Sequence, residues 1–338
     1  MCSGTNSARW VLNRGSSNAE IHFSGTPRKA IWFADRSRLP LRGRLFMYAM
    51  FLLKPPIDFD EAAYLAAYPE IAQAKADRIF DTGWQHFSVY GWREGRWRGL
   101  KPLANPHNGL PVPSPHLRYR IHGAVEPMDL CRVGNFNANL ISEVIRTRMG
   151  STENLRVLDF GCGCGNVSSA LAFMNPGLTV YGTDIDEEAI RWCRDNIGSV
   201  VHSVANSALP PLPFEANFFD FIYCVSVFTH LPEDMQFAWL DELKRVLKPG
   251  GYAWATFHGE NHVQGNFAQY REQWENRGFV YDTRFPTEGL PEFYQTTLHH
   301  PRYIEREWSK HLHVVEIKKM ACGQGDFAHD TALLHKAD

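Results

Sequence analysis

The feature that most constrains the fold is a short apolar run that leads into a glycine-rich turn. The run from Val157 to Phe160 is followed by Gly161, Gly163 and Gly165 at alternate positions. Glycine supplies the unusual dihedrals of a tight turn and lets the backbone approach a ligand closely. The residues after the turn have the pattern of a helix. A buried strand, a glycine turn and a helix in this order predict an α/β fold with a ligand held at the turn.

The spacing of these glycines argues against one large class of α/β enzymes. The dinucleotide-binding fingerprint, Gly-x-Gly-x-x-Gly, requires Gly or Ala at position 166. This position is Asn166. The turn therefore disfavours a nicotinamide or flavin dehydrogenase.

Strand-like and helical segments alternate after the turn, which predicts a parallel sheet with helices on both faces. In such sheets, ligands bind at the carboxyl ends of the strands. Near the C-terminus we expect closing strands, the last two of them an antiparallel pair. The expected strands are 156–160, 178–183, 219–225 and 252–257, then 279–281, 312–317 and 331–334; the expected helices follow Gly165, start at Asp186, span 232–247 and, before the core, span 139–147.

Four motifs in chain order resemble those of class I S-adenosylmethionine-dependent methyltransferases. They are Asp159 with the glycine turn, the strand that ends at Asp184, the run from Phe219 to Leu231, and the segment 247–251. The resemblance implies a Rossmann-like seven-stranded sheet, mostly parallel with an antiparallel last strand and helices on both faces. It also implies S-adenosylmethionine as the cofactor.

The resemblance implies a role for the acidic residue that ends the second strand. A carboxylate can accept two hydrogen bonds from a diol, so Asp184 is expected to bind both ribose hydroxyls. The alternative is that Asp184 caps the next helix, although Asp186 fits that position better. Many relatives carry an acidic residue before a Leu-Pro-Phe segment for the adenine amine, but here the position is Ala208. Asn206 or Ser207 is expected to serve instead. The full expected set for the cofactor is Asp159, Gly161, Cys162, Gly163, Asp184, Ile185, Asn206, Ser207, Cys224 and Val225.

The candidate catalytic residues are histidines. Transfer of a methyl group to an alcohol or phenol requires removal of a proton, and histidine suits this near neutral pH. His230 and His258 follow predicted strands and are expected at the mouth of the cofactor site, although either could simply cap or pack a helix. His299 and His300 are weaker candidates in the region that would cover the pocket. Nearby aromatic rings could pack there or face the sulfonium; these are Tyr294, Tyr303 and Trp308.

Residues 59–96 resemble a short module found beside glycosyltransferase and methyltransferase domains of bacterial surface-glycan pathways. This context favours a glycan-type acceptor. The simpler interpretation is a helical cap whose own core contains Trp84, Tyr90 and Trp92. The expected organisation is a poorly ordered basic leader at 1–55, a helical module at 56–100, a Pro-rich linker at 101–116 and the methyltransferase domain at 117–338, with its core at 151–258 and a C-terminal cover at 259–338.

Composition narrows the partners and the compartment. The net charge is −2, so there is no global argument for nucleic acid as a partner. The seven cysteines show no metal-ligand spacing, so no metal site is expected, and reduced thiols favour a cytoplasmic protein. The apolar run from Leu45 to Leu53 is much shorter than the roughly 20 residues of a membrane span. A signal peptide, or a start of translation at Met47 or Met50, is an alternative for the leader.

The expected function is O-methylation of a small-molecule or glycan-type acceptor. One alternative is a cofactor-binding subunit or scaffold without catalytic activity. Another is methylation of a protein or a nucleic acid, for which neither an Asn/Asp-Pro-Pro-Tyr/Phe motif nor a basic face is evident. The sequence does not define the acceptor, the methylated atom or the oligomeric state.

Overall fold

The computed structural model describes residues 10–12, 21–23 and 54–337, except for 92–93, 124, 266, 285–290 and 323–327. Contacts divide the chain into two units, 1–50 and 51–338. In the first unit, β1 (Trp10–Leu12) pairs with β2 (Ile21–Phe23) in antiparallel fashion. Most of the predicted leader, including its apolar run, lies outside the described residues. Among the helices that are described, none is long and apolar enough to cross a bilayer.

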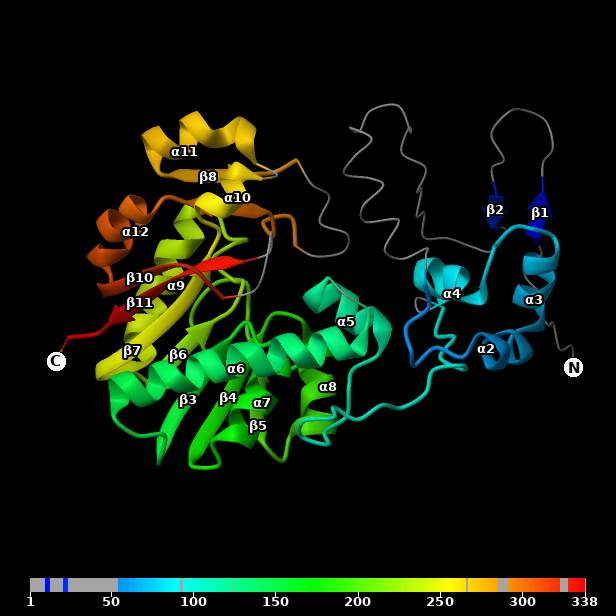
Figure 1. Ribbon diagram of the computed structural model, residues 1–338, viewed down its shortest axis with the longest axis horizontal. Helices are drawn as coiled ribbons and strands as arrows, with labels where there is room; N and C mark the ends of the chain where they lie inside the picture. The colour runs from blue at the N-terminus through cyan, green and yellow to red at the C-terminus, as the bar shows by residue number, and fades with distance from the viewer. Residues whose placement is uncertain are drawn as a thin grey trace, which may run out of the picture. The chain divides into compact units, whose positions relative to one another are not determined.

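The second unit is built around a seven-stranded sheet with the order β10-β11-β7-β6-β3-β4-β5 (Figure 1). Neighbours from β7 to β5 are parallel, whereas β11 is antiparallel to both β7 and β10. This arrangement confirms the predicted fold class, including the antiparallel last strand. The strands are β3 (Leu155–Phe160), β4 (Leu178–Asp184), β5 (Val201–Ala205), β6 (Phe219–Cys224), β7 (Leu247–Phe257), β10 (His313–Cys322) and β11 (His329–His335).

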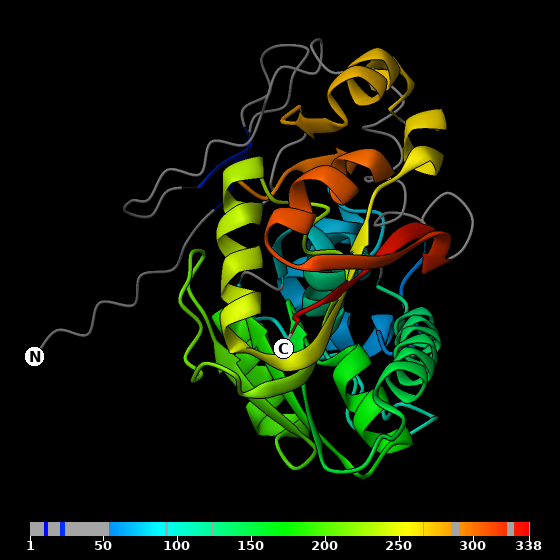
Figure 2. The same ribbon diagram turned by 90° about the vertical axis from the view of Figure 1, so that its left-hand side faces the viewer.

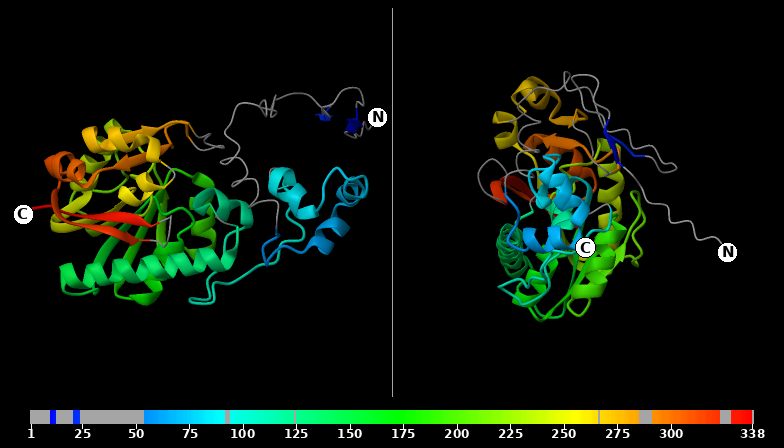
Figure 3. Two further views of the ribbon diagram at one scale, coloured as in Figure 1. Left: turned by 45° about the horizontal axis from the view of Figure 1, so that its top comes forward. Right: turned by 90° about the vertical axis from the view of Figure 1, so that its right-hand side faces the viewer.

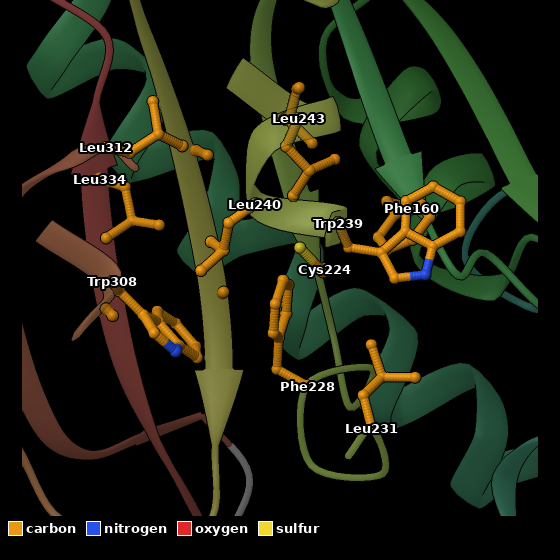
Figure 4. Packing of buried hydrophobic residues seen from close by; sticks show 14 of the residues in the cluster. Phe160, Cys224, Phe228, Leu231, Trp239, Leu240, Leu243, Trp308, Leu312 and Leu334 are labelled. Carbon is orange, nitrogen blue, oxygen red and sulfur yellow. The ribbon is translucent and has the colours of Figure 1, made fainter. Parts of the chain in front are cut away.

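Helices cover both faces of this sheet because its strands alternate apolar side chains between two cores. Val157 packs on one face with α6 (Pro127–Met149), α7 (Asn166–Met174) and α8 (Glu187–Ile197). Leu158 packs on the other face with α9 (Glu233–Val246). Figure 2 shows α9 and α6 on opposite sides of the sheet. Leu240 and Leu243 of α9 lie in this core together with Phe228 and Trp308 (Figure 4).

One helix and one strand of the main sheet region differ from the sequence prediction. The helix predicted at 139–147 is much longer, because α6 begins at Pro127 and continues through Gly134 and several asparagines, which are weak helix formers. A Cβ at position 134 would lie 2.4 Å from the Asn166 side chain, so close packing against α7 explains the glycine. Strand β5 was not predicted, because it is a short edge strand with half-exposed residues and no regular apolar alternation.

A separate layer lies beyond the carboxyl end of β7. It contains α10 (Glu260–Gln264), α11 (Arg271–Arg277), β8 (Phe279–Asp282), β9 (Thr296–His299) and α12 (Pro301–Glu307). Strand β8 was predicted to close the main sheet, but it instead pairs with β9 in a two-stranded sheet. The prediction that the last two strands form an antiparallel pair is confirmed by β10 and β11.

The region before the core contains α2 (Glu61–Ala67), α3 (Pro69–Ala76), α4 (Gly83–His86) and the short π-helix Phe87–Gly91 (Figure 3). Its apolar cluster contains Phe59, Tyr64, Ile71, Trp84 and Phe87. Tyr90, expected in this core, is instead 45% exposed. Trp92 lies outside the described residues.

Helix α5 (Pro115–His122) begins inside the segment predicted as a linker. The buried Arg118 guanidinium donates to both carboxylate oxygens of Asp58, at 2.7 and 2.8 Å, and to the backbone oxygens of Pro113 and Val125. This ion pair connects α5 to the start of the helical region. It is almost completely shielded from solvent, since the side chains are 0% and 5% exposed.

Candidate cofactor and acceptor site

The glycine-rich turn is attached to the end of the neighbouring strand. The N–H groups of Gly161 and Cys162 donate to the backbone oxygen of Thr183 at 2.8 and 2.9 Å. Gly161 has φ of +84°, a conformation that other residues rarely adopt, and a Cβ there would lie 2.3 Å from Cγ2 of Val227. The turn therefore requires glycine both for its backbone conformation and for the close approach of the loop after β6.

Asp184 lies at the carboxyl end of β4, directly beside this turn. Its Oδ2 accepts a hydrogen bond from the N–H of Gly163 at 2.8 Å, and its Oδ1 accepts one from the N–H of Asp186 at 2.9 Å. Each carboxylate oxygen retains a further lone pair, so the group can still accept hydrogen bonds from a diol. Burial raises the pKa of Asp184, and these backbone hydrogen bonds oppose that rise.

The alternative role for Asp184 as a helix cap is not what the structure shows. Asp186 is the N-cap of α8, and its side chain accepts from the N–H groups of Glu188 and Ala189. Arg120 of α5 donates to both oxygens of Asp186, at 2.7 and 3.1 Å. Ile121 of α5 sits against the turn, since a Cβ at Gly163 would lie 2.2 Å from its Cγ2. No sequence pattern indicated that α5 would cover the turn.

Asn206, one of the two residues expected to contact the adenine amine, offers a hydrogen-bond acceptor. Its N–H donates to the backbone oxygen of Asp184 at 3.0 Å, so it lies beside the ribose-binding candidate. Its Nδ2 donates to the backbone oxygen of Ser207, but its buried Oδ1 has no partner among the described residues. An unsatisfied buried acceptor costs free energy, and a ligand amine would relieve that cost. Ser207, the other candidate, is exposed. These residues therefore fit S-adenosylmethionine.

Other predicted cofactor residues support the turn from within the protein. The Asp159 carboxylate accepts hydrogen bonds from Ser168 Oγ and, at 2.9 Å, from Tyr223 Oη. Burial raises its pKa to about 7. The Cys224 side chain is fully buried in the apolar core beside Trp239 (Figure 4). The side chains of Asp159 and Cys224 thus fix the ends of β3 and β6.

The remaining predicted residues line the same edge of the sheet. Cys162 is buried within the turn, and Ile185 follows Asp184 in a half-buried position. Val225 follows β6 and packs partly against the core. The carboxyl ends of β3, β4, β5 and β6 therefore bring the predicted cofactor residues to one edge, as the parallel sheet requires.

His230 is held in a defined protonation state next to this edge. Its Nδ1 lies 2.7 Å from the backbone oxygen of Gln295. Because a carbonyl oxygen can only accept, Nδ1 carries the proton and Nε2 keeps a lone pair. Burial lowers the pKa of His230 to about 4, so the ring is neutral near pH 7. Its Nε2 lies 3.4 Å from Ser226 Oγ.

Tyr294 stacks on His230 with ring centroids 4.0 Å apart and planes 15° apart. Burial raises the pKa of the Tyr294 phenol, and the Asp184 carboxylate adds to that rise. Of the three aromatic residues considered from the sequence, Tyr294 is the one that stacks on His230, whereas Tyr303 donates to Glu233 and Trp308 is buried in the core of the sheet.

Ser226 has an unusual backbone at the end of β6. Its φ is +60°, its N–H donates to Thr256 Oγ1 at 2.7 Å, and its Oγ lies 3.0 Å from Thr229 Oγ1. A left-handed conformation in a residue with a side chain costs free energy and concentrates at functional sites. The sequence placed Ser226 in a motif but gave no indication of this conformation.

The other candidate histidines have different environments. His258 is buried with its ring centroid 6.1 Å from that of His230, and its Nδ1 lies 3.1 Å from the backbone oxygen of Thr297. His299 is fully buried, and its Nε2 lies 2.9 Å from Gln236 Oε1. His300 caps α12 by accepting from the N–H of Arg302. Neither His299 nor His300 joins the site.

Part of the chain is similar to a known protein family. Residues 158–255 match the family model described as "Methyltransferase domain". The match confirms the expectation of a methyltransferase domain that uses S-adenosylmethionine.

Curated relatives match part of the chain. The tRNA N(3)-cytidine methyltransferase of Gallus gallus is 34% identical over 113 residues, which are 30% of this chain and 30% of that protein. The fatty-acid O-methyltransferase of Mycolicibacterium smegmatis is 34% identical over 30% of this chain and 36% of its own length. The ubiquinone biosynthesis O-methyltransferase of Haemophilus ducreyi is 27% identical over 38% and 54%. The chain thus spans about a third to a half of the length of these relatives.

Solved structures are similar at lower identity. A methyltransferase from Methanosarcina mazei has a TM-score of 0.44 and 22% identity, covering 57% of this chain and 97% of that one. The magnesium protoporphyrin IX methyltransferase of Synechocystis PCC 6803 has a TM-score of 0.46 and 16% identity, covering 66% and 94%.

Proposed function

We propose that this chain transfers a methyl group from S-adenosylmethionine to an oxygen of a small-molecule or glycan-type acceptor. The observation that carries the proposal is the juxtaposition of two parts. The Asp184 carboxylate is fixed beside the glycine turn, and a neutral His230, whose Nε2 lone pair faces Ser226 Oγ, lies near the same edge of the sheet. The first part suits a cofactor ribose, and the second suits a hydroxyl proton.

The residues that would hold the cofactor follow from their hydrogen-bonding capacity. Asp184 would accept from the ribose hydroxyls, and the unpartnered Asn206 Oδ1 would accept from the adenine amine. Gly161 and Gly163 both have positive φ, which gives the turn its shape beside Asp184. When bound, S-adenosylmethionine supplies an activated methyl group on a sulfonium that leaves as a neutral thioether. The protein therefore contributes mainly positioning.

An oxygen acceptor is favoured by the state of His230. Its Nδ1 proton is fixed by the Gln295 carbonyl, so only Nε2 can take a proton. An acceptor hydroxyl placed beside Nε2 would give up its proton as the oxygen attacks the methyl carbon. Ser226 Oγ, 3.4 Å from Nε2, marks where such a hydroxyl can hydrogen-bond. His230 is thus the proposed catalytic base, and Tyr294 is a positioning residue that orients its ring.

The proposal also names a chemical class for the acceptor, which is a small molecule or a glycan. Proteins similar to part of this chain are named a tRNA N(3)-cytidine methyltransferase, a fatty-acid O-methyltransferase and a ubiquinone biosynthesis O-methyltransferase, so their names do not point to one class of acceptor. The glycan component is supported by the resemblance of residues 59–96 to modules of bacterial surface-glycan pathways.

Five described cysteines are free thiols, which supports a reducing, cytoplasmic setting.

The experiment that tests the proposal begins with the cofactor. Isothermal titration of the full chain with S-adenosylmethionine is expected to show one site, which Asp184→Asn weakens strongly. Asp195→Asn, on the exposed face of α8, is the matched control and should bind like the wild type. Labelled methyl transfer to a panel of sugars, phenols, small alcohols, carboxylic acids, RNA and protein then identifies the acceptor. Absence of cofactor binding by the wild type would refute the proposal, and binding without transfer to any acceptor would favour a scaffold.

A further inference from the structure

Three histidines from separate elements converge beside His230. His258 follows β7, His262 lies on α10 and His329 begins β11. One ring nitrogen from each lies within 4.8 Å of the others. Their ring centroids are separated by 4.1 Å for His258 and His262, 4.8 Å for His258 and His329, and 5.4 Å for His262 and His329. Nothing in the cofactor site accounts for this cluster.

The tautomer of His258 is set for coordination. Its Nδ1 lies 3.1 Å from the backbone oxygen of Thr297, and a carbonyl can only accept, so Nδ1 carries the proton. The lone pair therefore remains on Nε2. Metal-binding histidines almost always donate their other ring N–H to a carbonyl or carboxylate in this way, which fixes the ring orientation.

The cluster favours lone pairs over protons. The three ring centroids lie within 5.4 Å of one another, so a proton on one imidazole disfavours a proton on the next. Neutral imidazoles are the form that binds metals. Three rings that repel each other's protons can share one cation, which relieves the electrostatic conflict.

A buried carboxylate lies next to the cluster. Asp330 is 2% exposed, and one of its oxygens would be 1.8 Å from a Cβ placed on Gly259. The carboxylate therefore lies against the backbone immediately after His258. A buried cation requires nearby negative charge or strong ligands. Asp330 supplies that charge, and Gly259 leaves the space for it.

We propose that His258, His262 and His329 bind a divalent transition-metal ion, with Zn²⁺ as the expected occupant. Imidazole donors suit Zn²⁺ and related metals, whereas Mg²⁺ and Ca²⁺ prefer oxygen ligands. Zn–N bonds of about 2.0–2.1 Å imply nitrogens about 3.3 Å apart, so small side-chain rotations would close the present arrangement. Three protein ligands leave a fourth position open to water or another ligand.

This site changes the role of His258. As a ligand it cannot also serve as the base for methyl transfer, so the two candidates from the sequence separate into a base, His230, and a metal ligand, His258. The metal site stands on its own geometry and does not depend on the proposed function. The spacing His-x-x-x-His at 258 and 262 was the signal available in the sequence.

The test uses the full chain, freed of metal by chelation and dialysis, and titrated with Co²⁺. A bound four-coordinate Co²⁺ is expected to give intense visible absorption that saturates at one equivalent and is displaced by Zn²⁺. His262→Ala and His329→Ala should each weaken Co²⁺ binding by on the order of 100-fold. The control is His313→Ala, an exposed histidine on β10, which should bind like the wild type.

The design separates metal binding from folding. Circular dichroism of each variant verifies its fold, and if His329→Ala does not fold, the half-buried His262 decides the result. Saturable binding lost in His262→Ala supports the site. Absence of the visible bands in the wild type would overturn it. So would equal affinity in the folded wild type and His262→Ala, because the metal would then bind elsewhere.

Discussion

The Asp184 carboxylate accepts a hydrogen bond from the backbone N–H of Gly163 at 2.8 Å, which fastens the end of β4 to the glycine-rich turn after β3. Two sequence motifs that lie apart in the chain thus form a single surface. The same carboxylate accepts from the N–H of Asp186, so both of its oxygens are oriented before a ligand arrives. Such preorganisation reduces the free-energy cost of binding.

Replacement of Asp184 by Asn is expected to weaken S-adenosylmethionine binding by about 10- to 100-fold, the loss that accompanies charge-assisted hydrogen bonds of about 1.5–3 kcal/mol. The variant should fold, because burial already disfavours the charge and raises the pKa of this carboxyl. Isothermal titration measures the affinity, and a thermal melt measures the stability. Unchanged affinity in a folded Asp184→Asn protein would exclude the ribose-binding role.

Replacement of His230 by Gln is expected to lower kcat by about 100- to 10,000-fold, the usual contribution of a general base, with little change in cofactor affinity. In the wild type, burial lowers the pKa of His230 to about 4. The base is therefore active above that pH and is lost as the pH falls through about 4. The rate profile for the acceptor found in the screen tests this; an inflection near pH 6.5 that disappears in His230→Gln would contradict the assigned environment.

Stability should decrease in mild acid because of buried neutral histidines. Burial lowers the pKa of His299 to about 3, whereas an unfolded histidine has a pKa of about 6.5. Between these values the unfolded state binds more protons, so acidification favours unfolding by up to about 1.4 kcal/mol per pH unit for this residue. Denaturant titrations of wild type and His299→Gln at pH 7 and pH 5 measure the effect. The difference in stability between the two pH values should be smaller in the variant; an equal difference would show that His299 does not contribute.

Replacement of Gly161 by Ala is expected to destabilise the fold by about 1–3 kcal/mol, because φ of +84° is unfavourable for alanine. The added Cβ would also lie 2.3 Å from Val227 Cγ2. The double variant Gly161→Ala/Val227→Ala removes this clash but not the backbone strain. Chemical denaturation of the double variant should therefore show a smaller loss of stability than the sum of the losses in the two single variants. Full additivity of their effects would show that the close approach is unimportant.

Removal of the Asp58 carboxylate is expected to cost about 3–5 kcal/mol, because it leaves a buried guanidinium without its partner. Arg118 is completely shielded and donates to both Asp58 oxygens. The double variant Asp58→Ala/Arg118→Met removes the orphan charge and should recover much of the loss. Denaturant unfolding of the single and double variants measures this coupling, and a loss below about 1 kcal/mol for Asp58→Ala would indicate that the pair is solvated.

The sequence alone was sufficient to predict most strands of the sheet, the glycine-rich turn and the position of Asp184 at the end of a strand. Each of these depends on a local pattern of residues. Apolar alternation gives a strand its two buried faces, and parallel strands bring their carboxyl ends to one edge. Local sequence patterns did not predict β5 or the start of α6, because tertiary packing overrides weak local preferences there. The assignment of the helix cap to Asp186 rather than Asp184 was also available from the sequence and is confirmed.

Only the tertiary structure decided which side chains meet at the site. Tyr294 stacks on His230, and Ile121 packs against the turn at Gly163, although these partners lie far apart in the chain. The sequence makes both His230 and His258 candidate bases, whereas in the structure His258 has two further histidine neighbours, His262 and His329. The local pattern of apolar residues indicates which face of a helix or strand is buried. Contacts between distant segments depend on how the connections cross the sheet edge, and no local period encodes that path.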